Sequence, residues 1–221
     1  MIITNDGKIQ PVGKVTKTLI GNCIYEKPGF LEAVGNSGYS YTHENPATES
    51  ARGGFIRLKT GENGGDRAIL RTTFPVHLKG VEEIRLEVNG IRGNQTSQIG
   101  FGVAPIPLDN AEDAGVVFWN DKVRFYQSDG DFNAKEPKVE WLSEQPRLYN
   151  FTFIVRPKKQ EVILLQNDQI VALYHEEFNT ETEHEVYPKI SISYNEDAIT
   201  NSDDNAGMIW ISQVKVSLSH L

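Results

Sequence analysis

Cysteine is almost absent from this chain: one residue in 221, Cys23, carries a thiol. An intrachain disulfide, a pair of redox thiols and a thiolate zinc site are therefore excluded. Cys23 lies in the apolar stretch LIGNCIYE, and we interpret it as a small buried residue rather than a nucleophile. A chain of this length can bury most of its apolar surface without covalent cross-links, so we expect a fold held by packing alone.

Basic charge and long apolar runs are also scarce. Lys and Arg total 22 against 30 Asp and Glu, the formal net charge is −8, and the basic residues are scattered. This balance disfavours nucleic acid and anionic lipid surfaces as partners. No segment approaches the roughly 20 apolar residues of a membrane span, and the N-terminal stretch MIITNDGKIQPVGK lacks the apolar core of a signal peptide. We expect a soluble protein without membrane insertion, located in the cytoplasm or, for a phage product, in the virion.

Helical periodicity is nearly absent, whereas short alternating runs recur with Gly, Asn and Asp between them, which is typical of strands. VEEIRLEVNG (81–90) and SQIGFGV (97–103) each place apolar residues on one face of a predicted strand. These inward sets are Ile84, Leu86 and Val88 in the first run and Ile99, Phe101 and Val103 in the second. On the other face of the second run, Gly100 and Gly102 leave a shallow surface that suits either a close ligand or a packed neighbour.

The chain as a whole predicts an all-β fold. GVVFWNDKVRFYQ (115–127) indicates a hairpin, 147–174 three consecutive strands, and 207–218 a long closing strand. Roughly a dozen strands exceed what one open sheet holds comfortably, so we predict one antiparallel two-sheet β-sandwich of jelly-roll type over 1–221. Residues 1–52 are either an N-terminal arm or its first strands. We assign Trp210 to the core, together with the strand face of Tyr149, Phe151, Phe153 and Val155.

The strand series at 147–174 and the closing run at 207–218 resemble the concanavalin A-like and laminin G-like lectin sandwich superfamily over about residues 53–221. The resemblance implies two curved antiparallel sheets, sugar bound on a concave face or loop rim, and often calcium nearby. Its members include lectins, adhesion domains, virion proteins, glycoside hydrolases and polysaccharide lyases. The galectin motif His-x-Asn-Pro-Arg is approached by His43-Glu44-Asn45-Pro46, but Ala47 replaces the Arg, which argues against a galectin.

One carboxylate pair could serve a glycosidase. The retaining enzymes of the superfamily that this chain resembles carry Glu-x-Asp-x-Glu on one strand, and Glu83-Ile84-Arg85-Leu86-Glu87 is similar except for Arg85. An Arg between Glu83 and Glu87 would lower the pKa of both carboxyls, whereas a general acid needs a raised pKa. We therefore prefer a charged solvent face to catalysis, and we assign no catalytic residue.

Three acidic loops are candidate calcium sites, and one of them is LDNAEDAG (108–115), with Asp109, Asn110, Glu112 and Asp113. In SDGDFNAKEPKVE (128–140), oxygen ligands fall on positions 1, 3, 5 and 12 of a calcium loop, although Ala134 replaces the turn glycine. These ligands are Asp129, Asp131, Asn133 and Glu140. The loop NEDAITNSDDNAG (195–207) contributes Asp203 and Asp204 just before the closing strand. Each loop is equally well explained as a solvated acidic turn without an ion, so the sequence leaves two alternatives open: bound Ca²⁺ or no cofactor.

Sugar binding commonly combines an aromatic ring with amide and carboxylate groups. Trp119, Asn120 and Tyr126 lie around the predicted hairpin turn, and Trp141 follows Glu140, so these four are the candidate ligand-binding residues. The sequence favours a non-catalytic carbohydrate-binding or adhesion module that recognises glycan, with or without calcium. One alternative is a structural or assembly protein, such as a virion or phage tail component, that forms a homo-oligomer. The second alternative is a glycan hydrolase or lyase.

Overall fold

A computed structural model of the chain describes residues 2–3, 9–10, 31–35, 38–44, 55–64, 66–94, 97–104, 114–119, 122–125, 148–175, 177–178, 180, 185–194 and 206–220. Within these ranges the regular secondary structure is strand, apart from one 3₁₀ turn, η1 (Pro157–Lys159). None of the described segments is a helix long and apolar enough to cross a membrane. Strands β1 (Ile2–Ile3) and β2 (Ile9–Gln10) pair only with each other.

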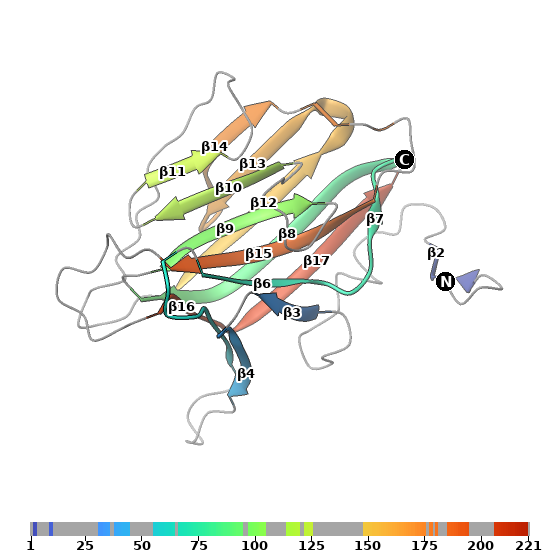
Figure 1. The fold of residues 1–221 in the computed structure, drawn as a ribbon. Coiled ribbons are helices and arrows are strands. Elements are labelled where there is room, and N and C mark those ends of the chain that lie inside the picture. Colours follow the sequence, from blue (N-terminus) through green and yellow to red (C-terminus); the bar gives the residue numbers. More distant parts are fainter. Residues whose placement is uncertain are drawn as a thin grey trace.

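Two antiparallel sheets form the two layers of the molecule (Figure 1). The first, which we call sheet I, has the strand order β11-β10-β9-β15-β6-β3, and β7 also pairs with β15. Its strands are β3 (Leu31–Gly35), β6 (Arg67–Thr72), β7 (Val76–His77), β9 (Ser97–Ala104), β10 (Ala114–Trp119), β11 (Lys122–Phe125) and β15 (Glu185–Tyr194).

The second sheet, which we call sheet II, has the order β14-β13-β12-β8-β16-β5-β4, and β17 also pairs with β8. Its strands are β4 (Ser40–Glu44), β5 (Phe55–Lys59), β8 (Val81–Gly93), β12 (Tyr149–Arg156), β13 (Glu161–Gln166), β14 (Gln169–His175), β16 (Met208–Ile211) and β17 (Gln213–His220). Strands β3 and β4 precede residue 52 and pair with β6 and β5, one in each sheet. The predicted antiparallel two-sheet β-sandwich is confirmed.

Strand β8 is long enough to pair with both β17 and β16, and a bend at Ser212 separates the two stretches. Gly90 has φ 63°, and a Cβ built there would lie 2.3 Å from Ser212 Oγ, so a side chain is excluded by both conformation and space. The pairing of β12 with β8 also shifts its register between Tyr149 and Phe151. This irregularity changes the alternation of β8, so that Val88 and Ile91 are both buried.

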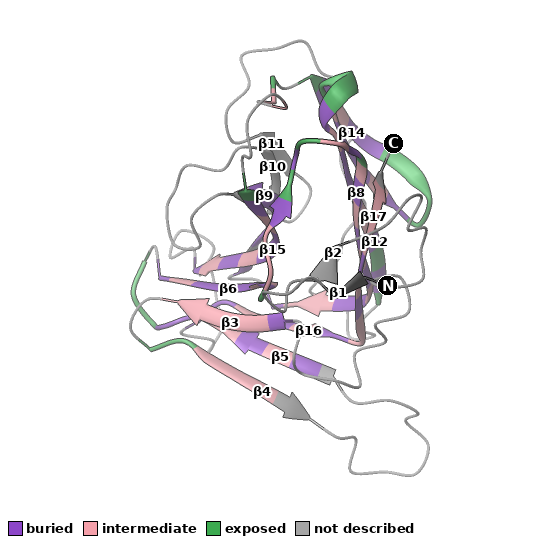
Figure 2. Ribbon diagram, turned by 90° about the vertical axis from the view of Figure 1, so that its right-hand side faces the viewer, coloured by how far each residue is buried: buried purple, intermediate pink, exposed green. Residues whose placement is uncertain are grey.

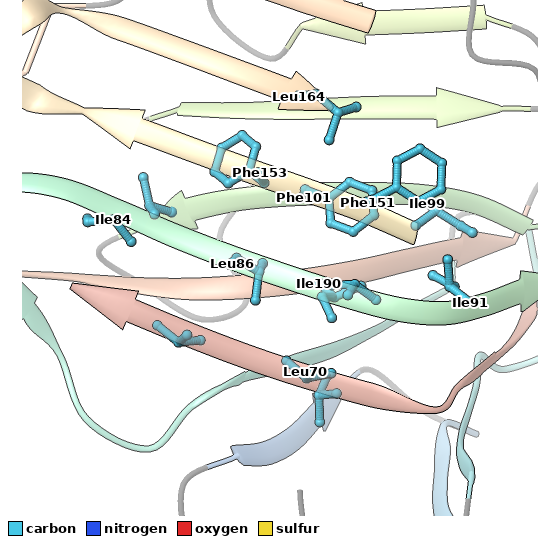
Figure 3. Packing of buried hydrophobic residues seen from close by; sticks show 14 of the residues in the cluster. Leu70, Ile84, Leu86, Ile91, Ile99, Phe101, Phe151, Phe153, Leu164 and Ile190 are labelled. Carbon is cyan, nitrogen blue, oxygen red and sulfur yellow. The ribbon is translucent and has the colours of Figure 1, made fainter. Parts of the chain in front are cut away.

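The core fills the space between the sheets, where the apolar residues of alternating strands meet (Figures 2 and 3). Phe101 of sheet I and Phe151 of sheet II lie side by side with ring centroids 5.4 Å apart. The predicted inward sets of 81–90 and 97–103 and the Tyr149 to Val155 face are confirmed as buried. The assignment of Trp210 to the core is wrong: Ile209 and Ile211 point inward, so Trp210 lies on the opposite face and is partly exposed.

A buried polar network closes one end of the sandwich. Asn94 Oδ1 accepts hydrogen bonds from the Ser97 hydroxyl and from the Met208 amide at 2.9 Å, and Asn94 Nδ2 donates to the Ala206 carbonyl at 2.7 Å. Asn94 is 8% exposed, so these bonds satisfy a polar side chain that would be costly to bury alone. The network joins the connection between β8 and β9 to the start of β16.

Candidate functional site

The predicted carboxylate pair lies on the outer face of sheet II, within an ion-pair ladder. Glu83 Oε1 accepts a hydrogen bond from Arg85 Nε at 2.9 Å, and Glu83 Oε2 accepts one from Arg156 Nε at 2.9 Å. Arg156 also donates from Nη1 to Glu161 Oε2 at 3.3 Å. Glu87 has its own cation, with Lys215 Nζ 2.5 Å from Glu87 Oε2. Both carboxylates are thus held by basic side chains from their own or a neighbouring strand.

Partial burial alone would raise the pKa of Glu83, but the hydrogen bonds from Arg156 and Arg85 outweigh it and hold the pKa below its ordinary value. The same contact with Glu83 raises the pKa of Arg156. A general acid must carry its proton near neutral pH, which requires the opposite shift. The ladder is therefore suited to stabilising the sheet rather than to acid catalysis.

Glu83→Gln is expected to remove about 1 kcal/mol of stability at pH 7, because the charge-assisted bonds to Arg156 and Arg85 weaken. A folded-state pKa below the unfolded value stabilises the fold above the unfolded pKa, and this contribution is lost as pH falls through the folded pKa. Urea denaturation of both proteins at pH 7 and at pH 3 measures the difference. A gap between the two proteins that is as large at pH 3 as at pH 7 would contradict this assignment.

The other predicted site residues mostly lie outside the described ranges. Trp119 ends β10 and is paired by register with Lys122 of β11, but its side chain is not among those described. The remaining candidates, all outside the described residues, are Asp109, Asn110, Glu112, Asp113, Asn120, Tyr126, Asp129, Asp131, Asn133, Glu140, Trp141, Asp203 and Asp204. In the described part of the chain, no group of three or more His, Cys, Asp and Glu side chains could hold a metal ion. The calcium and rim-aromatic assignments stay predictions.

A cluster of basic residues on the outer face of sheet I was missed by the sequence interpretation. In β6, Ala68 and Leu70 point into the core, so Arg67 and Arg71 lie on the outer face. Strand β15 pairs Lys189 with Arg71, which places two cations directly opposite each other on neighbouring strands. Like charges in such a pair are unfavourable, so this arrangement concentrates positive charge on a chain whose net charge is −8.

The surroundings orient this pair. The Arg71 guanidinium lies over the Tyr187 ring with Cζ 4.7 Å from the ring centroid, and Arg71 Nη2 lies 2.5 Å from Glu32 Oε1. The stack and the ion pair fix the plane of the guanidinium, which favours directional binding by its remaining N–H groups. Lys189 is only 3% exposed and is itself engaged in an interaction. The positive charge is therefore held in place rather than carried on mobile side chains.

Beside Arg71 and Lys189, the strands of sheet I carry several glycines. Lys189 pairs across β15 and β9 with Gly102, which in turn pairs with Gly115 of β10, while Gly100 pairs with Ser191. Because Ile99, Phe101 and Val103 fill the inner face, these glycines carry no side chain on the outer face; both are buried, as is Ile69 on the same face of β6. We call the surface formed by Arg71, Tyr187, Lys189, Gly100 and Gly102 the cationic face.

No protein-family model matches the sequence, and no curated protein is similar to it. Solved structures with similar folds include alginate lyase AlgAT5 of polysaccharide lyase family 7, at 10% identity, TM-score 0.54, and 87% coverage of this chain and 95% of that chain. Arcelin-5, a lectin-like defence protein from Phaseolus vulgaris, is 9% identical with a TM-score of 0.52, and the match covers 87% of this chain and 100% of that chain. A protein of unknown function from Shewanella oneidensis is 11% identical with a TM-score of 0.50, and the match covers 86% of this chain and 79% of that chain.

These similarities bear out the resemblance to concanavalin A-like β-sandwiches, and they concern the fold alone. At 9–11% identity they establish the fold and transfer no residue role. The fold is shared by a lectin-like protein and by a lyase, so the reaction or binding partner must be argued from the residues of this chain.

Proposed function

We propose that this chain is a non-catalytic glycan-binding module that recognises acidic polysaccharide on the cationic face of sheet I. The observation that carries the proposal is the Arg71–Lys189 pair, in which Arg71 is partly exposed and Lys189 is buried on the neighbouring strand. A guanidinium binds carboxylate or sulfate through two parallel N–H bonds, and an ammonium adds a point charge. A sugar chain on this face would bring an acidic group to the partly exposed Arg71 and its hydroxyls to Ser191, while the buried Lys189 adds positive potential without contacting the ligand.

The proposal is for binding rather than cleavage because of what the described part of this face offers. Its carboxylates are Glu32, which is paired with Arg71, and Glu185, which lies 3.5 Å from His77 at the edge of the sheet. Neither is positioned as a free acid or base beside Gly100 and Gly102. The similarity of fold to an alginate lyase and to a lectin-like protein is consistent with a carbohydrate ligand, and it supports no choice between cleavage and binding.

The experiment is a glycan array that contains acidic and neutral polysaccharides, probed with millimolar calcium and with EDTA. We expect saturable binding to acidic members that weakens as salt is raised, with no release of reducing ends. Loss of binding in EDTA would add a calcium site to the proposal, and binding in both conditions would leave calcium out. Preference for neutral glycans, or release of new reducing ends, would overturn it. Silence on the whole array would favour the structural and assembly alternative.

Arg71→Gln is expected to weaken binding to the best acidic glycan by about tenfold or more, which corresponds to about 1.4 kcal/mol. Lys158→Gln removes an exposed lysine of η1, away from the cationic face, and is the matched control that should bind normally. Because Arg71→Gln also leaves Glu32 without its cation, the double variant Glu32→Gln/Arg71→Gln separates the loss of the Arg71 charge from repulsion of the ligand by an unpaired Glu32 carboxylate. Calorimetric titration measures all four proteins, and equal affinities would contradict the proposal.

A further inference from the structure

A second cluster of basic and aromatic residues lies on the outer face of sheet II, near the end of β8 opposite the Glu83 ladder. Cross-strand register places Thr42 beside Arg57, Arg57 beside Trp210, and Trp210 beside Arg92. Ile56, Leu58, Ile209 and Ile211 fill the inner face of the same strands. The four outer residues, on β4, β5, β16 and β8, therefore form a continuous row, which we call the Trp210 row.

The basic residues at the two ends of sheet II differ in whether they form ion pairs. In the ladder, Arg85, Arg156 and Lys215 each have a carboxylate on their own or a neighbouring strand. Arg92 has no ion pair with any residue that the structure describes, and its guanidinium lies over the Trp210 ring with Cζ 4.6 Å from the centroid. The charge of Arg92 is therefore positioned by stacking and is not neutralised within the described sheet.

The stack determines which part of Arg92 is available to a ligand. Arg92 Nε is buried and makes no hydrogen bond, so the two terminal Nη groups form the edge that remains for binding. A guanidinium held flat on an indole has lost much of its rotational freedom, which lowers the entropic cost of binding a carboxylate or sulfate end-on. Arg57 lies two strands away, or about 9.6 Å, so an extended anionic chain crossing the strands can contact both arginines.

We propose that the Trp210 row is a second site for acidic polysaccharide, so that one molecule of this protein bridges two polysaccharide strands. The inference rests on the proposed function, because it assigns the same class of ligand to a second surface. Sheets I and II form the two layers of the sandwich (Figure 2), and because the buried residues of both sheets face the core between them, the cationic face and the Trp210 row lie on opposite outer faces. A single short oligosaccharide cannot cover both, whereas a long polymer is cross-linked with a gain from multivalency.

The test uses polygalacturonate as the long probe and a short oligogalacturonate as the monovalent probe. Titration calorimetry with the short probe is expected to give two sites for the wild type, one site for Arg92→Gln and one for Arg71→Gln. Light scattering with the long probe is expected to rise for the wild type and to fall at least tenfold for Arg92→Gln. Arg92→Lys keeps the charge but loses the planar fork, so it should also lose most of the cross-linking, and Lys158→Gln should behave as the wild type.

Three outcomes separate the two proposals. One short-probe site in the wild type, unchanged in Arg92→Gln but lost in Arg71→Gln, would overturn the second site and leave the proposed function standing. Absence of binding by the wild type to either probe would overturn both for this class of ligand. Two sites that both survive Arg92→Gln, with thermal unfolding unchanged, would place the second site elsewhere and overturn the inference.

Discussion

Phe101→Ala is expected to lower the free energy of unfolding by about 3 to 5 kcal/mol, a large share of the roughly 5 to 15 kcal/mol typical of a domain. Phe101 is 1% exposed and contacts Phe151 of the opposite sheet with ring centroids 5.4 Å apart. Removing the ring leaves a cavity between two rigid sheets that cannot collapse onto it, so the lost contacts are not replaced. Chemical denaturation followed by tryptophan fluorescence measures the change.

The matched control is Leu148→Ala, because Leu148 is 51% exposed and should cost less than about 0.5 kcal/mol. A double-mutant cycle with Phe101→Leu and Phe151→Leu should show a coupling of about 0.5 to 1.5 kcal/mol between the two sheets. If Phe101→Ala cost under about 1 kcal/mol, or if the cycle showed no coupling, the sheets would not pack face to face at this point.

The second large effect is expected for Asn94→Ala, at about 2 to 4 kcal/mol. The substitution leaves the Ala206 carbonyl without its bond from Asn94 and the Met208 amide with only its 2.7 Å bond to Ser97 Oγ, at a buried position where water does not replace the lost bonds easily. Each unsatisfied buried group costs about 1 to 3 kcal/mol, and the network joins two segments of the chain that are distant in sequence. Denaturant unfolding measures the loss.

Asn150→Ala is the matched control for Asn94→Ala. Asn150 is also an asparagine at a strand boundary, and its Oδ1 accepts one hydrogen bond, from the Gly90 amide at 2.9 Å, but it is exposed to water. Its replacement should cost about 1 kcal/mol or less, because water can take its place. Equal losses for the two variants would show that the Asn94 network contributes no more than an ordinary surface hydrogen bond.

The sequence predicted the fold from alternation, and the failures have a physical cause. The runs 81–90 and 97–103 alternate polar or glycine with apolar residues, so their inward faces could be assigned directly. Strand β16 is apolar on both faces, MIWI, and alternation therefore could not show that Trp210 points outward. Its position depends on the Arg92 stack, which requires the pairing of β16 with β8, a long-range contact that no local pattern specifies.

The candidate site shows the same limit. Gly100 and Gly102 could be assigned to a shallow face because both lie in one alternating strand. Arg71, Tyr187 and Lys189 come from β6 and β15, and their proximity follows only from the register of two strands that are far apart in the chain. The loop residues predicted to bind calcium or sugar, such as Asp129, fall outside the described ranges, and their roles stay predictions.

The most direct test of the cationic face is a two-dimensional amide NMR titration of the wild-type protein with a short oligogalacturonate. The account predicts that the backbone amides of Gly100, Gly102 and Ser191 shift in proportion to saturation, and that these shifts disappear in Arg71→Gln while the rest of the spectrum is preserved. If these three amides did not shift, and only amides of the loops at 128–140 and 195–207 did, the result would contradict the account. The ligand would then bind at the acidic loops.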